Sequence, residues 1–420
     1  MRSHLALRAF IALSLTASPA LAQPRRRTAH VAAPTTPPYY DTAPLIEGLR
    51  PSVRADLVSA ARLARLDALP YYDLRLTIGA DGRSYTLHEE LWFTNNERTA
   101  LNELVLRLYG NATVPAPQSG AAAQGRTVVL HPPIAFVRGN CPDAACTVTH
   151  EALSVLSVRP TAPIAPGGHL RVALDLTGTL PEIDASRTNI FAQGMESLSS
   201  LGASESNSDY GLLAKGEGIT SLANFYAVLA RRQRNAWDRA EGSTVGDIGS
   251  DDLANVRALI DTPAGYTVAT TGTALRSTDA DGRHRVEVGA AAVRDFAVLT
   301  SSVLQVATRR VGDVEVRSFF LAGDRAAGER VLDVAAHALE DFERRFGTYP
   351  YVDLDVVEAP LVGGAGGVEF PGLVTVASMF YHPPRATGLS GALLSMLGGG
   401  NLDDTLGQML PTMLEFVTAH

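Results

Sequence analysis

Short segments in which apolar and polar residues alternate follow one another along most of the chain. Residues 72–78 and 85–93 show this period of two on either side of a turn that contains Asp81 and Gly82. Alternation that flanks an Asp-Gly pair predicts a β-hairpin. Similar segments, separated by Pro and Gly, lie at residues 104–109, 126–130, 147–158, 170–176, 256–261, 266–271, 285–288 and 296–301. Many short strands at near-regular spacing predict an antiparallel sandwich or saddle of sheets.

The sequence pattern changes after about residue 306. A strand at 314–321 precedes a helical period over 326–346, and strands at 354–358 and 373–377 precede another helical period over 406–420. Pro411 should lie in the first turn of that last helix or kink it. The Ser/Gly-rich segment 190–224 has no clear period and is expected to be a long irregular connection. The predicted fold class is α+β, an N-terminal antiparallel β-domain followed by a mixed domain.

The composition excludes several classes of protein. Hydrophobic residues make up 46% of the 420 residues, which is too high for a disordered chain. There are 36 Lys and Arg against 44 Asp and Glu, and Lys215 is the only lysine. The net charge of −8 and the scattered arginines argue against nucleic-acid binding. No apolar run approaches the roughly 20 residues that cross a bilayer, so we expect no transmembrane anchor.

The N-terminus has the pattern of a secretory signal. Arg2 and Arg8 precede a short apolar run at 9–15, and the small residues of Ala20-Leu21-Ala22 follow. We therefore expect residues 1–22 to be a signal peptide and the mature chain to begin at Gln23. Residues 23–45, which begin with a Pro- and Arg-rich stretch, are expected to form a disordered leader. The protein should be exported, either periplasmic or extracellular.

Cys141 and Cys146 are the only two cysteines. In an exported protein such a pair is expected to oxidise, so we predict one structural disulfide that closes a short loop. A metal site is the alternative, but His131 and His150 are not at the spacing of a zinc knuckle.

Common catalytic motifs are absent from the sequence. It contains no phosphate-binding loop and no Gly-x-Ser-x-Gly elbow. The smallest gap between neighbouring histidines is 19 residues, as between His150 and His169, so no two can be zinc ligands on one helical turn. A complete metalloprotease motif is therefore missing from these residues.

A glycine-rich segment, residues 363–367, leads to Glu369 and then to a predicted strand. Glycines allow another backbone to approach closely, and a carboxylate at their edge can receive a cationic group. This arrangement suits an extended peptide whose free amine lies at Glu369. A tight turn with a solvated glutamate is the alternative.

The same segment carries a family resemblance. Gly364-Ala365-Gly366-Gly367-Val368-Glu369-Phe370-Pro371-Gly372 resembles the Gly-x-Met-Glu-Asn exopeptidase loop of the zinc aminopeptidases of the membrane alanyl aminopeptidase (aminopeptidase N, gluzincin) family. The agreement extends over further segments, at residues 72–78, 224–230, 263–268, 294–297 and 342–347.

The resemblance implies a fold, a cofactor and a substrate class. The fold would be a β-domain at 46–306 followed by the first part of a thermolysin-like domain at 307–420. The family uses zinc to activate a water that cleaves the first residue from peptide or protein N-termini. The substrate-binding residues would be Gly364, Ala365, Gly366, Gly367, Val368 and Glu369, and His420 would match the first zinc histidine.

The match also has departures. Val368 replaces the usual Met and Phe370 the usual Asn or Tyr, which leaves the contacts to the substrate strand open. Glu217 is a weak candidate for the polar residue that the first domain supplies to the substrate amine. Because the remaining zinc ligands and the catalytic Glu would lie beyond His420, we expect an incomplete chain that neither retains zinc nor hydrolyses peptides. A non-catalytic peptide-binding module and a structural β-domain protein are the alternatives, and the sequence does not predict the oligomeric state.

Overall fold

A computed structural model describes residues 40–58, 66–112, 132–194, 210–240, 249, 252–382 and 402–420. The chain folds mainly into β-sheets with few helices, and all the described residues belong to one compact unit. The predicted α+β class is confirmed. The signal peptide, most of the leader and the strand predicted at 126–130 lie outside the described residues.

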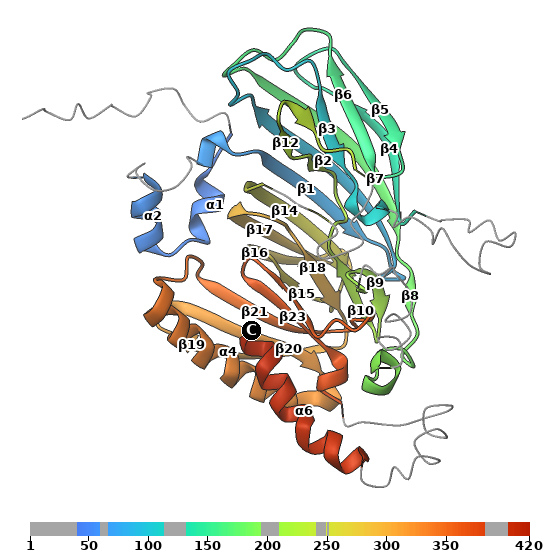
Figure 1. Ribbon diagram of the computed structural model, residues 1–420, viewed down its shortest axis with the longest axis vertical. Helices are drawn as coiled ribbons and strands as arrows, with labels where there is room; N and C mark the ends of the chain where they lie inside the picture. Colours follow the sequence, from blue (N-terminus) through green and yellow to red (C-terminus); the bar gives the residue numbers. More distant parts are fainter. Residues whose placement is uncertain are drawn as a thin grey trace, which may run out of the picture. The chain divides into compact units, whose positions relative to one another are not determined.

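The largest sheet has seven strands (Figure 1). The central hairpin is the predicted one, and β1 pairs with β2 in antiparallel register from Tyr71 opposite Trp92 to Ile78 opposite Tyr85. The one parallel pair in this sheet is β1 with β14. The order is β16 (Thr273–Ala280), β17 (Arg283–Val293), β14 (Ala254–Pro263), β1 (Tyr71–Ile78), β2 (Ser84–Thr94), β7 (His169–Thr179) and β4 (Ile134–Asn140).

A four-stranded sheet shares a hydrophobic core with the large one, in which Leu74 and Leu76 of β1 pack with Leu104, Leu106 and Leu156. Its order is β11 (Val228–Leu229), β3 (Leu104–Arg107), β6 (Val155–Pro160) and β5 (Cys146–Ala152). A small two-stranded sheet consists of β12 (Arg232–Gln233) and β13 (Ala236–Trp237). The predicted strand at 147–158 is thus two strands, because the chain turns between Ala152 and Val155. Cys141 and Cys146 form the predicted disulfide, with the sulfur atoms 2.00 Å apart.

A fourth sheet corrects the prediction for residues 190–224. Its order is β15 (Thr267–Thr270), β18 (Val298–Ser301), β10 (Ile219–Leu222), β9 (Leu213–Gly216) and β8 (Glu182–Ile183). The expected irregular connection therefore contains the hairpin β9–β10. Glu217 and Gly218 connect its strands with φ of 51° and 80°, and positive φ at both loop residues is typical of a two-residue hairpin turn.

The fifth sheet and two helices form the C-terminal part (Figure 1). The sheet order is β19 (Leu304–Val311), β20 (Val314–Leu321), β21 (Asp353–Ala359), β23 (Leu373–Ala377) and β22 (Gly367–Phe370). The helices α4 (Arg325–Phe346) and α6 (Leu402–Ala419) contact each other and both contact this sheet. Pro411 lies inside α6 rather than in its first turn, because the helix begins earlier than the sequence pattern suggested.

Helix α4 forms because its apolar residues recur at helical spacing. Val331, Ala335 and Leu339 are buried on one face, and the helix ends before Gly347, whose φ is 106°. This face packs in a second core with residues from β20, β21, β23 and α6, and also with Ile219 and Leu299 of the fourth sheet. The division at 306/307 stays a prediction; residue 306 lies inside β19, which the sequence pattern did not predict.

Short helices precede the first strand. They are α1 (Ala43–Glu47) and α2 (Pro51–Val58), and short 3-10 helices occur at Leu66–Ala68, Tyr109–Asn111, Ala322–Asp324 and Ser378–Phe380. Tyr40 is buried against Tyr71, with the rings stacked 4.2 Å apart, so residues 40–45 of the expected leader are ordered. An aromatic side chain that buries its ring anchors this segment. No helix among the described residues is long and apolar enough to cross a membrane.

Candidate functional site

The glycine-rich segment turns the chain between β21 and β22. Gly363 and Gly364 adopt φ of 72° and 82°, which residues with a Cβ rarely tolerate. The turn is fixed to the rest of the fold at two points: Val362 N donates to Tyr210 O at 3.1 Å, and Gly364 N donates to Gln193 Oε1 at 2.7 Å. These bonds set the direction in which β22 begins.

Strand β22 is the edge strand of its sheet. It pairs with β23 in antiparallel register, which places Glu369 opposite Val374. Within the described residues no strand lies on its other side. An edge strand presents unpaired backbone N–H and C=O groups, to which an extended peptide can add as a further strand.

Helix α6 approaches β22 at two further glycines. A Cβ built on Gly367 would lie 2.9 Å from Cγ1 of Val417, and one built on Gly366 would lie 3.4 Å from Cγ2 of the same residue. The absence of side chains at these positions lets α6 pack directly on the strand. His420, which follows α6, is thereby held beside the sheet, and its backbone N–H donates to Phe416 O at 3.0 Å.

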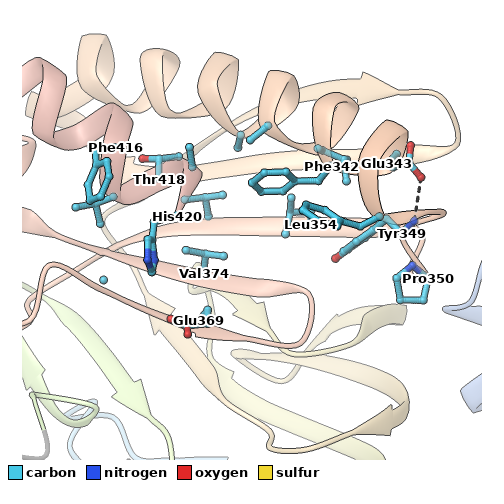
Figure 2. A pocket seen from close by; sticks show the side chains of 18 of the residues that line it. Phe342, Glu343, Tyr349, Pro350, Leu354, Glu369, Val374, Phe416, Thr418 and His420 are labelled. Atoms are coloured by element: carbon cyan, nitrogen blue, oxygen red, sulfur yellow. Dashed lines mark hydrogen bonds between the residues drawn. The ribbon is translucent and has the colours of Figure 1, made fainter. Parts of the chain in front are cut away.

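A cavity of about 540 Å³ lies between these elements (Figure 2). Its lining comes from α4, the segment after α4, β21, β22, β23 and α6, and its walls are largely apolar, with Leu339, Phe342 and Val356 among them. Gly367, Val368, Glu369 and His420 all line it, whereas Gly364, Ala365 and Gly366 are not among the lining residues. The structure therefore brings together Glu369 and His420, two residues that the sequence singled out from separate elements.

Two carboxylates, those of Glu343 and Glu369, line the cavity. Glu343 is occupied: its Oε1 accepts a hydrogen bond from Tyr349 N at 3.0 Å, drawn in Figure 2, and pairs with Arg50. The side chain of Glu369 is exposed and has no hydrogen bond or ion pair with any described residue. It is the carboxylate that remains free to receive a cationic group.

The residues around His420 do not form a zinc site. A catalytic zinc ion needs about three protein ligands. Among the described residues, the group of three that could hold an ion is Glu217, Glu358 and His382, and it contains neither His420 nor Glu369. The cofactor that the family resemblance implies thus does not fit the described part of this cavity.

Glu217 lies elsewhere than the sequence prediction suggested. It sits in the turn of the β9–β10 hairpin, is not among the described residues that line the cavity, and lies beside His382, with Glu217 Oε1 3.7 Å from His382 Nε2. Glu358 and His382 were not predicted as site residues. The one signal for this group in the sequence is the Gly-Glu-Gly turn, which places Glu217 at a position that favours glycine.

The charges of this group shift its pKa values. The carboxylate of Glu217, followed by those of Asp324 and Glu358, raises the pKa of His382 to about 9. Burial raises the pKa of Glu358 to about 8. Burial also acts to raise the pKa of Glu217, but the nearby polar groups of His382, Ser378 and Thr188 outweigh it, and the pKa of Glu217 is lowered.

Of the known proteins compared with this chain, solved structures alone gave matches. No family model matches the sequence, and no curated protein matches it. Among solved structures, the chain is similar to the M1 zinc metallopeptidase from Deinococcus radiodurans, with a TM-score of 0.44 and 16% identity over 74% of this chain and 60% of that one. A mutant of that enzyme bound to a Tyr-Ser-Ala substrate matches with a TM-score of 0.43 and 17% identity over 73% of this chain and 60% of that one. This chain thus covers less than two thirds of these structures.

Proposed function

We propose that this protein binds the free N-terminus of peptides at β22, with Glu369 as the acceptor of the amine, and that it is related to the zinc aminopeptidases that its glycine-rich segment resembles. The observation that carries the proposal is the position of Glu369. Its carboxylate is unpaired, lies on an edge strand and faces an apolar cavity. A charged amine and such a carboxylate form a charge-assisted hydrogen bond.

The cavity also suits a peptide that lies along β22 with its free amine at Glu369. A peptide that adds to the edge of β22 would place its first residues beside Val368 and Glu369, which both line the cavity. The apolar walls that include Phe342 and Phe416 can then take an apolar side chain of the peptide. At Val368 and Phe370 this chain differs from the family. We therefore expect it to prefer other peptide side chains at β22 than the family does.

Hydrolysis is a separate question from binding. In the family, zinc supplies the activated water, and His420 is the position that matches its first ligand. No set of three ligands surrounds His420 among the described residues, so these residues do not supply the metal site that hydrolysis in the family requires. We expect the 420-residue chain to bind peptides without cleaving them, which an assay with aminoacyl-anilides can check. Release of the anilide in a metal-dependent reaction would contradict this expectation.

The cellular setting is part of the proposal. The N-terminal pattern predicts export, and the Cys141–Cys146 disulfide is the kind of bond that persists in an oxidising compartment. Peptides or protein N-termini in the periplasm or outside the cell would then be the ligands.

The test compares a short apolar peptide with its N-acetylated form by isothermal titration calorimetry. The free peptide should bind more tightly, and Glu369→Gln should remove the difference because the variant no longer carries the negative charge. A loss of roughly 1.5–3 kcal/mol, about 10- to 160-fold in affinity, is the scale of a hydrogen bond to a charged group. Glu329→Gln is a matched control, since Glu329 is an exposed acid on α4 outside the cavity lining.

The same experiment separates the alternatives. Equal binding of the free and acetylated peptides would contradict the role of Glu369 but would fit a peptide-binding module that does not recognise the amine. No binding of either peptide would favour a structural β-domain protein, in which the glycine-rich segment is only a turn.

A further inference from the structure

Four chain segments bring ionisable side chains to one partly buried point away from the cavity described above. Glu217 comes from the β9–β10 turn, Glu358 from β21, His382 from the segment after β23, and Asp324 from the residue that precedes α4. Ligand atoms of Glu217, Glu358 and His382 all lie within 4.8 Å of one another. None of these three residues is used by the proposed peptide-binding site.

The imidazole of His382 has a different partner on each nitrogen. Its Nδ1 lies 3.0 Å from Asp324 Oδ1, which is a hydrogen-bond distance. Its Nε2 lies 3.7 Å from Glu217 Oε1 and 3.7 Å from Glu358 Oε1, which is too long for a hydrogen bond. Histidines that bind a metal through one nitrogen commonly donate the other N–H to a carboxylate in this way.

The 3.7 Å separations match those between ligands of one ion. Donor atoms at 2.0–2.2 Å from a tetrahedral zinc ion are roughly 3.3–3.6 Å from one another. The distances from the imidazole nitrogen to the two carboxylate oxygens are therefore close to those that one ion requires, and the ligand atoms of Glu217 and Glu358 lie within 4.8 Å of each other. A small movement of the side chains would bring all three to ligand distances.

Glu358 gives an independent reason to expect a ligand. Its side chain is completely buried, and while Oε2 accepts a hydrogen bond from Leu321 N at 2.9 Å, Oε1 has no hydrogen-bond partner among the described residues. Oε2 of Glu217 and the hydroxyl of Tyr381 are likewise buried without a hydrogen bond. A buried carboxylate oxygen without a partner is costly, and a bound cation would satisfy it.

We propose that Glu217, Glu358 and His382 form a binding site for one divalent transition-metal ion, with Asp324 as the group that orients His382. The imidazole ligand favours an ion of the zinc type over Mg²⁺ or Ca²⁺, which prefer oxygen ligands only. Thr188 Oγ1 donates to Glu217 Oε1 at 2.8 Å and so restrains this carboxylate.

The site has a structural consequence. The ion would join the β9–β10 hairpin to β21 and to the segment after β23. The hairpin already contacts the chain that leads into the glycine-rich turn, since a Cβ on Gly216 would lie 2.8 Å from Pro360 Cβ. Metal binding should therefore stabilise the part of the fold that holds the glycine-rich turn and, through this turn, β22. The expectation that the chain does not retain zinc was based on His420 as the one available ligand, and a zinc ion bound at this site would contradict it.

The test uses the 420-residue chain stripped of metal, with Zn²⁺ alone as the probe. Competition against a chromophoric chelator should show one ion per chain, and Zn²⁺ should raise the thermal unfolding midpoint. His382→Ala and Glu358→Gln should abolish both effects, and Asp324→Asn should weaken the affinity 10- to 100-fold.

Two control variants distinguish this site from other histidines. His284 pairs with Asp279 at 2.6 Å but belongs to no group of three ligands among the described residues, so His284→Ala should leave zinc binding unchanged. His420→Ala should also leave it unchanged. Because peptide binding through Glu369 is measured separately, failure of one proposal does not decide the other.

A spectroscopic measurement on the unaltered protein covers the case in which a variant fails to fold. X-ray absorption of the zinc-loaded chain should show a single imidazole together with oxygen ligands. Absence of stoichiometric binding, zinc binding that survives His382→Ala, or a coordination shell with two or more imidazoles would overturn the proposal. The group would then be an ion pair between a protonated His382 and its acidic neighbours.

Discussion

Val417 of α6 lies directly against Gly367 of β22. A Cβ on Gly367 would be 2.9 Å from Val417 Cγ1 and 2.9 Å from the backbone oxygen of Thr375. This close approach is what holds the end of α6, and with it His420, at the same cavity as Glu369. The glycine therefore has a packing role in addition to any role in peptide binding.

The first prediction concerns this contact. Gly367→Ala should destabilise the protein by about 1–3 kcal/mol, the usual cost of overpacking, because a backbone oxygen cannot move away easily. Chemical denaturation followed by circular dichroism measures the change. Gly407→Ala is the matched control: it lies in α6 with open space around it, so alanine should be neutral or stabilise the helix by up to about 1 kcal/mol. Equal effects of the two substitutions would contradict the packing role.

The second prediction concerns Glu89, a completely buried residue of β2. Burial raises the pKa of Glu89 to about 8, although Ala227 N donates a hydrogen bond to it at 2.9 Å. The folded protein thus keeps the proton up to about pH 8, whereas the unfolded chain releases it near its ordinary pKa of 4.5. The contribution of Glu89 to stability is complete below pH 4.5 and is lost as the pH rises through 8.

Glu89→Gln should remove this dependence, because the amide stays neutral at every pH. The free energy of unfolding of the unaltered protein should fall, relative to the variant, by up to about 1 kcal/mol per pH unit between pH 4.5 and 8. Urea titrations of both proteins across this range measure the difference. Two parallel pH profiles would show that Glu89 does not hold its proton in the fold.

The third prediction concerns the disulfide. Cys141 and Cys146 are five residues apart, so the bond closes a short loop and its removal by Cys141→Ser with Cys146→Ser should cost about 2 kcal/mol. Thermal unfolding measures the loss. Mass spectrometry of the secreted protein before and after reduction should show no free thiol and a mature chain that begins at Gln23. Two free thiols in the native protein would contradict the bond.

The sequence predicted those parts of the fold in which local pattern and tertiary packing agree. The hairpin β1–β2 alternates around an Asp-Gly turn, and α4 has one apolar face at helical spacing, so both were placed to within one or two residues. Glu369 and His420 were singled out through a family resemblance, and the structure adds that they line one cavity.

The elements that were missed lack such local signals. Strands β9 and β10 are buried on both faces and do not alternate, and their turn places Glu217 at a φ that charged residues seldom adopt. Strand β22 is four residues long and begins with glycine, so its sequence pattern did not distinguish it from a loop. In the group of Glu217, Glu358 and His382, Glu217 lies more than a hundred residues before the other two, and no spacing in the sequence indicates such a site.

The central claim is that peptides bind along β22 through their free amine, and hydrogen exchange of the backbone amides tests it most directly. On addition of a saturating peptide with a free N-terminus, the amides of β22 that point away from β23, those of Gly367 and Glu369, should become protected, because an added strand accepts hydrogen bonds from this edge. The amide of Val368, which already donates to Thr375 Oγ1 at 3.2 Å, should change little. The acetylated peptide at the same concentration should protect the Gly367 and Glu369 amides much less, and so should the free peptide with Glu369→Gln. Protection of a different segment, or equal protection by both peptides, would contradict the account.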